Sequence, residues 1–269
     1  MIPKIIHYCW FGGNPLPPKA KECIRSWKKY CPDYEIIEWN ESNFDVNSYV
    51  YTKQAYDNKK WAFVTDVVRL HALCNYGGIY MDTDVEVIKP LDQFLNHRAF
   101  SGFEDATNIP TGIMAAEKGH PLFVELLADY ESRPFIVDGQ PDLTTNVETI
   151  SNLLLPHGFV PNNTYQEVSG LALYPYDYFC PRDIHTMKLL VTENTYTIHH
   201  FAGSWLPEEA VARQKYKIRK NRIEEKYGTR MAQIYESFYF SLRANGGEGI
   251  GAYVIRIVKR RIDRMLDRS

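Results

Sequence analysis

Two aspartates separated by one residue directly follow a short apolar segment, in the sequence IYMDTD at 79–84. If Ile79 to Met81 form a buried strand, the alternation of strand side chains places Asp82 and Asp84 on the same side, where the strand ends. Hard cations such as Mg²⁺ and Mn²⁺ prefer oxygen ligands and bind through one or two carboxylates together with substrate phosphates. The pair therefore indicates a divalent-metal site for a diphosphate substrate, and two exposed acids in a turn are the alternative.

A second pair of charged residues, Asp66 and Arg69, lies three positions apart in a segment that is otherwise mostly apolar. In a helix this spacing places both side chains on one face. They could form a buried ion pair with a structural role only. Alternatively, they lie in a ligand crevice, where Asp66 accepts hydrogen bonds from sugar hydroxyls and Arg69 donates to hydroxyl or phosphate oxygens. Trp10 could stack on a nucleobase, or simply pack in the core.

Strand-like and helix-like segments alternate in the part of the chain that carries these residues. The alternation predicts an α/β domain with a largely parallel sheet, whose ligands lie beyond the carboxyl ends of the strands, where Asp82 and Asp84 fall. From Glu208 onward the pattern is helical and charged. We expect strands at 4–10, 34–39, 79–81, 99–103, 112–116 and 196–201, and helices at 18–30, 60–75, 120–130 and 144–155.

Composition limits the class of protein. With 269 residues and 45% hydrophobic content, one main domain is the best expectation. A net charge of -2 disfavours nucleic acid as a partner. The five cysteines are scattered, without a Cys-x-x-Cys pair, which fits a reducing cytosol. No segment has the pattern of a signal peptide or the length of a transmembrane helix.

Three separate segments together resemble a known family. They are the opening IPKIIHYCW at 2–10, the region 61–84 with its Asp-x-Asp, and the late HHFAGSW at 199–205. In this order they resemble glycosyltransferase family 32, which is distantly similar to the catalytic domains of the clostridial glucosylating toxins. The resemblance implies a GT-A fold, a nucleotide-sugar donor, a Mn²⁺ or Mg²⁺ ion and retention of the anomeric configuration.

Carried over by position, the resemblance also assigns roles to individual residues. Asp82 would contact the donor sugar or the metal, Asp84 would bind the metal, and His200 would be a late metal ligand, with His199 as the fallback. An imidazole ligand suits manganese better than magnesium. A histidine with a purely structural role is the alternative. The other residues to which the resemblance gives roles are Tyr8, Trp10, Asp66 and Arg69 at the donor, Asn146 as a polar contact to donor or acceptor sugar, and Ser204 and Trp205 in a loop that closes over the diphosphate.

The resemblance thus implies a retaining hexosyltransferase in polysaccharide biosynthesis, of the capsule or lipopolysaccharide type. The donor would be a nucleotide-diphosphate sugar, with UDP-hexose favoured over GDP-mannose, and the acceptor a glycan or lipid-linked saccharide. We expect a catalytic domain at 1–207, a helical extension packed on it at 208–245, and a glycine linker with a tail helix at 246–269. The expected location is the cytoplasm, with the inner face of the membrane as a second site.

The tail at 253–269 has apolar residues on one helical stripe and basic residues elsewhere. Such a helix can lie on an anionic membrane surface, or dock on the domain or another subunit.

Two other classes of protein compete with the transferase. A phosphatase of the haloacid dehalogenase type also uses Asp-x-Asp with Mg²⁺, but its motif normally continues to Thr or Val where this chain has Glu86. A non-catalytic sugar-binding protein is the other.

Overall fold

The structure, a computed structural model, describes residues 1–203 and 208–244. The chain divides into two units, Met1–Val211 and Ala212–Ser269. The linker expected at 246–251 and the tail helix expected at 253–269 lie outside the described residues. The expected packing of the helical extension on the catalytic domain stays a prediction, and each unit is described by itself.

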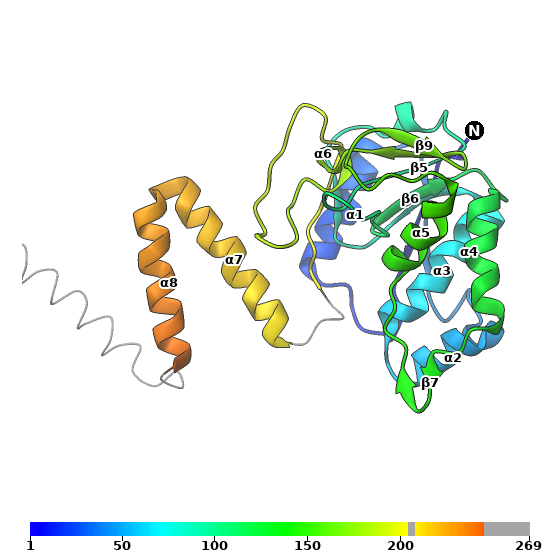
Figure 1. The fold of residues 1–269 in the computed structure, drawn as a ribbon, viewed down its shortest axis with the longest axis horizontal. Helices are drawn as coiled ribbons and strands as arrows, with labels where there is room; N and C mark the ends of the chain where they lie inside the picture. Colours follow the sequence, from blue (N-terminus) through cyan, green and yellow to red (C-terminus); the bar gives the residue numbers. More distant parts are fainter. Residues whose placement is uncertain (204–207, 245–269) are drawn as a thin grey trace, which may run out of the picture. The chain divides into compact units, whose positions relative to one another are not determined.

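A seven-stranded sheet forms the centre of the first unit (Figure 1). β1 lies between β2 and β3 and is parallel to both, and β5 is parallel to β10. β6 is antiparallel to β3 and β5, and β9 is antiparallel to β10, so the other five strands run in one direction. In spatial order the strands are β2 (Glu35–Trp39), β1 (Ile5–Cys9), β3 (Gly78–Met81), β6 (Ile113–Ala116), β5 (Ala99–Gly102), β10 (Leu171–Tyr174) and β9 (Gln166–Val168).

Helices cover both faces of this sheet, and a hydrophobic cluster fills each interface. Strand alternation divides β3 between the clusters, because Tyr80 faces one and Ile79 and Met81 face the other. One face carries α2 (Val50–Asp57), α3 (Trp61–Tyr76), α4 (Pro121–Ser132) and α5 (Asn146–Leu154), and the other carries α1 (Pro18–Tyr30) and α6 (Tyr176–Phe179). The smaller elements are β4 (Val85–Val87) paired with β11 (Thr197–His199), the hairpin β7 (Ile136–Val137) and β8 (Gln140–Pro141), and the 3-10 turns Val46–Ser48, Asp92–Phe94 and Leu155–His157.

A tight connection joins α3 to β3 and thereby brings the charged residues of both elements to one end of the sheet. Gly77 ends α3 with φ +69°, and a Cβ there would lie 2.7 Å from the backbone nitrogen of Lys118. Gly78 has φ +108°, and a Cβ there would lie 2.7 Å from the carbonyl oxygen of Ile5. Only glycine fits both positions, which lets the strand begin where the helix ends.

The helical second unit follows. α7 (Glu208–Tyr227) crosses the boundary between the units, and α8 (Thr229–Ala244) lies within the second. Tyr216 holds the two helices together: its ring stacks on Tyr239 at 4.1 Å and its hydroxyl donates to Glu236 at 2.7 Å. Throughout residues 1–203 and 208–244, no helix is both long and apolar enough to cross a membrane.

The predicted fold class, α/β with a mostly parallel central sheet flanked by helices and a helical C-terminal region, is confirmed. The expected strands and helices are all present, with ends that shift by a few residues. The helix α2, which the structure places between β2 and α3, was not among the expected helices.

Candidate active site

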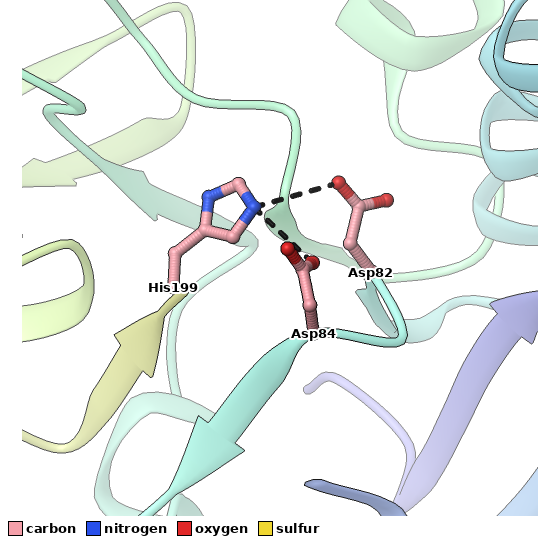
Figure 2. Close-up of side chains that lie close together, drawn as sticks. All are labelled: Asp82, Asp84 and His199. Carbon is pink, nitrogen blue, oxygen red and sulfur yellow. Dashed lines mark ion pairs between the residues drawn. The ribbon is translucent and has the colours of Figure 1, made fainter. Parts of the chain in front are cut away.

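Asp82, Asp84 and His199 meet at the carboxyl end of β3 (Figure 2). The two aspartates lie in the turn between β3 and β4, and His199 is the last residue of β11, opposite Val85 of β4. The Nε2 atom of His199 is 3.3 Å from Oδ1 of Asp84 and 3.9 Å from Oδ2 of Asp82. One ligand atom from each residue lies within 4.8 Å of the other two, so a single cation could contact all three.

Each carboxylate has one oxygen held by the protein and one that faces the cluster. Oδ1 of Asp82 accepts from the Tyr80 hydroxyl at 2.8 Å, which leaves Oδ2 toward His199. Oδ2 of Asp84 accepts from the backbone N–H of Ala202 at 2.6 Å, which leaves Oδ1 toward His199. The two inward oxygens and the imidazole nitrogen are therefore oriented in advance, and this set of donors fits a divalent cation such as Mn²⁺.

Asp84 and His199 strongly influence each other's protonation. Burial acts to raise the pKa of Asp84, but His199 and the Ala202 N–H outweigh it and lower that pKa to about 2. Burial acts to lower the pKa of His199, but Asp84 outweighs it and raises that pKa well above its usual value. The geometry therefore places a positive charge between the two carboxylates, as a proton on His199 or as a metal cation.

Arg69 connects this cluster to Asp66 on α3. Its guanidinium lies 3.3 Å from Asp66 and 3.6 Å from Oδ1 of Asp82, over the ring of Tyr80, and it donates to the carbonyl oxygen of Thr111 at 2.7 Å. Burial raises the pKa of Asp66 to about 6, against the opposing effect of Arg69. The carboxylates of Asp66 and Asp82 thus lie on either side of the Arg69 guanidinium. Such an arrangement can hold a sugar hydroxyl beside a phosphate.

The structure places the two adjacent histidines differently. His200, predicted as the metal ligand, directs its Nε2 atom to Glu86 at 2.8 Å, and Lys19 approaches the same carboxylate at 3.3 Å. His199, the fallback, is the residue that joins Asp82 and Asp84. His200 directly follows the last residue of β11, and its ring points to the side opposite that of His199.

Other predicted site residues differ in how they are placed. Trp10 follows β1 at the same edge of the sheet as the aspartates, and it is only partly buried. Tyr8 is buried on β1, and its hydroxyl donates to Glu38. Ser204 and Trp205 lie outside the described residues.

Asn146 has a different environment from the one expected. Its side chain is 1% exposed, its Nδ2 donates to the backbone oxygen of Asp66 at 2.9 Å, and its Oδ1 accepts from the Tyr130 hydroxyl. Both amide groups are thus used inside the protein. Asn146 holds α5 against α3 behind Asp66, rather than facing a sugar.

Sequence reasoning missed three contributors. Thr111 and Gly112 precede β6, where Thr111 accepts from Arg69 and Gly112 accepts the Asp82 N–H at 2.8 Å. Glu104 follows β5 at the same edge; burial raises the pKa of its carboxyl, which is electrostatically coupled to His199 and Asp82. In the sequence, the only feature that pointed to these three residues was their position, because all three lie beside the ends of expected strands.

Comparison with known proteins agrees with this site. The family model described as "Glycosyltransferase sugar-binding region containing DXD motif" matches residues 17–101. This segment, which includes the Asp-x-Asp, is therefore similar to the sugar-binding region of the DXD-containing glycosyltransferases.

Several known proteins are similar to parts of this chain. "Inositol phosphoceramide mannosyltransferase 3" of Schizosaccharomyces pombe is 33% identical over 130 residues, which are 47% of this chain and 36% of that protein. "Uncharacterized glycosyltransferase L373" of Acanthamoeba polyphaga mimivirus is 24% identical over 77% of this chain and 85% of its own length. The solved structure of PaToxG glycosyltransferase is 21% identical with a TM-score of 0.40, over 47% of this chain and 59% of that one. The match spans little more than a third of the length of the first curated relatives.

Proposed function

We propose that this protein is a metal-dependent glycosyltransferase that moves a hexose from a nucleotide-diphosphate sugar to a saccharide or lipid-linked acceptor. The observation that carries the proposal is the Asp82–Asp84–His199 cluster, joined through Arg69 to Asp66 at one edge of the sheet. A divalent cation there would supply Lewis-acid stabilisation of the departing diphosphate.

The protein's own groups account for the other requirements of transfer. Asp66 is positioned to accept hydrogen bonds from sugar hydroxyls. Its raised pKa makes it a stronger proton acceptor than an ordinary carboxylate. Arg69 is fixed by Thr111 and Asp82, so its charge is oriented before a substrate binds. Trp10, only partly buried at the end of β1, offers a ring face for the nucleobase.

The identity of the donor rests on two different arguments. Resemblance to the clostridial toxins favours UDP-hexose. The names of the yeast relatives, which are mannosyltransferases acting on inositol phosphoceramide, favour a mannosyl donor such as GDP-mannose and a lipid-linked acceptor. Retention of configuration, a role in capsule or lipopolysaccharide assembly, and a location at the inner face of the membrane complete the proposal.

A donor panel tests this function. The folded chain should show slow, Mn²⁺-dependent hydrolysis of one nucleotide sugar, and faster transfer when a saccharide acceptor is present. Asp84→Ala should abolish both reactions. A covalent aspartyl-phosphate on Asp82 would instead indicate a phosphatase, and sugar binding without any turnover would indicate a binding protein.

A further inference from the structure

The imidazole of His199 lacks the anchor that usually orients a metal-binding histidine. Such a residue normally donates its second ring N–H to a carboxylate, a carbonyl or water, which fixes the ring plane. The Nδ1 atom of His199 is buried and has no hydrogen bond of ordinary geometry among the described residues, although the Cys180 thiol interacts with the ring. A thiol is only a weak acceptor, so the ring plane must be fixed mainly by packing.

Gly112 provides one packing surface. A Cβ atom at this position would lie 2.7 Å from both Cε1 and Nδ1 of His199, closer than side-chain atoms approach one another. The backbone of Gly112 does not have a positive φ, so glycine is needed here for space rather than for conformation. Because its carbonyl oxygen also accepts the Asp82 N–H, the same residue positions two members of the cluster.

Phe201 provides the other surface. Its ring lies 4.0 Å from the His199 ring, centroid to centroid, with 33° between the planes. Its backbone has φ +52°, a left-handed conformation that costs free energy for any residue other than glycine. This turn lets the N–H of Ala202 reach Oδ2 of Asp84. A glycine or asparagine would adopt this backbone conformation at a lower cost in free energy, so the presence of an aromatic residue needs another explanation.

We propose that Phe201 is a positioning residue that, together with Gly112, holds the imidazole of His199 so that Nε2 points toward Asp82 and Asp84. Stacking replaces the missing hydrogen bond at Nδ1. The inference deepens the proposed function and rests on it, because it concerns the same metal site.

Three variants separate positioning from folding. Phe201→Leu removes the ring and keeps the backbone strain, Phe201→Gly removes both, and Phe201→Tyr keeps the ring. The probe is Mn²⁺ alone, titrated against each folded protein while the electron paramagnetic resonance signal of free Mn²⁺ is followed. We expect both ring-deleting variants to bind Mn²⁺ about tenfold to a hundredfold more weakly, the range seen when a supporting partner of a metal ligand is lost. Phe201→Tyr should stay within about twofold, and Phe201→Gly should unfold at no lower a temperature than the unmodified chain.

A double-variant cycle shows whether Phe201 acts through His199. In a His199→Ala background, Phe201→Leu should change Mn²⁺ affinity no further, and a further loss would overturn the inference. Unchanged affinity in both ring-deleting variants would also overturn it, while leaving the proposed function intact. Absence of Mn²⁺ binding by the unmodified chain would overturn the metal site and the inference together.

Discussion

The two adjacent histidines at the end of β11 show how much a single position matters. His199 faces Asp82 and Asp84, whereas His200 faces Glu86. The spacing of the aspartates predicted that both face one site, and this holds although they lie in the turn after β3 rather than in the strand itself. The choice of histidine depends on the register of β11 against β4, where a shift by one residue exchanges the two sides. The sequence around His199 does not encode that register locally.

These histidines provide a matched pair of variants. His199→Asn should weaken Mn²⁺ binding by about tenfold or more, because it removes an imidazole ligand. His200→Asn should change it by less than about twofold, because this ring is paired with Glu86. Titration calorimetry with Mn²⁺ measures both. The opposite ranking would restore His200 as the ligand.

Glu104 is the carboxyl group beside the cluster whose role remains to be assigned by experiment. It lies across β6 from Asp82 and is coupled to His199 and Asp82. We expect Glu104→Gln to leave Mn²⁺-dependent donor binding within about twofold and to slow transfer to a saccharide by about tenfold to a hundredfold, as for loss of a charged hydrogen bond. Donor calorimetry and initial transfer rates separate the two steps. An equal loss of donor binding would place Glu104 at the donor instead.

His7 makes the fold sensitive to acid. It is fully buried on β1, donates from Nε2 to the Gly77 oxygen and accepts from Trp39 at Nδ1, and burial lowers its pKa to about 4 against the opposing effect of the Gly77 hydrogen bond. As pH falls below about 6.5, the unfolded chain binds a proton that the folded chain does not. The free energy of unfolding should therefore fall by about 3 kcal/mol between pH 6.5 and 4 from this group.

The control for His7 is a side chain that does not titrate. In His7→Gln the amide can donate to Gly77 and accept from Trp39, so both hydrogen bonds can form at any pH. Urea unfolding at several pH values should show the stability of the unmodified chain falling by about 3 kcal/mol relative to His7→Gln as pH falls from 6.5 to 4. A difference that is constant with pH would show that His7 is not held neutral.

At the scale of secondary structure, α1 and α3 were predictable, because proline begins the first and Gly77 ends the second. α2 was not, since its sequence combines a β-branched start with polar residues and has weak helix propensity. Its formation depends on tertiary packing of Tyr51 and Ala55, both fully buried. Packing of this kind between distant segments leaves no local signal.

The α3–β3 connection can be tested directly. Gly77→Ala adds a Cβ 2.7 Å from the Lys118 nitrogen as well as backbone strain, whereas Gly119→Ala at φ +71° meets nothing within 4 Å. We expect a loss of about 3 kcal/mol or more for Gly77→Ala and about 1 kcal/mol for Gly119→Ala. Urea unfolding measures both. Equal losses would mean that the close approach at Gly77 is not required.

At the scale of the whole molecule, the described site is confined to the unit Met1–Val211, yet its residues come from segments more than a hundred positions apart. The α/β class followed from the alternation of elements. The alternation did not predict that β6 runs antiparallel to its neighbours. The expected strands at 99–103 and 112–116 had no helix between them, and this pattern favours an antiparallel pair. The order of the strands in the sheet could not be predicted from the sequence, since it depends on contacts between distant parts of the chain.

The most direct test of the central claim is calorimetric binding of UDP-hexoses and GDP-mannose to the unmodified chain and to Asp84→Asn, with Mn²⁺ and with a chelator. We predict binding of one donor by the unmodified chain in Mn²⁺, and a loss of at least about tenfold in affinity with the chelator or in the variant. Equal binding with and without Mn²⁺, or no binding of any donor by a folded preparation, would contradict the account.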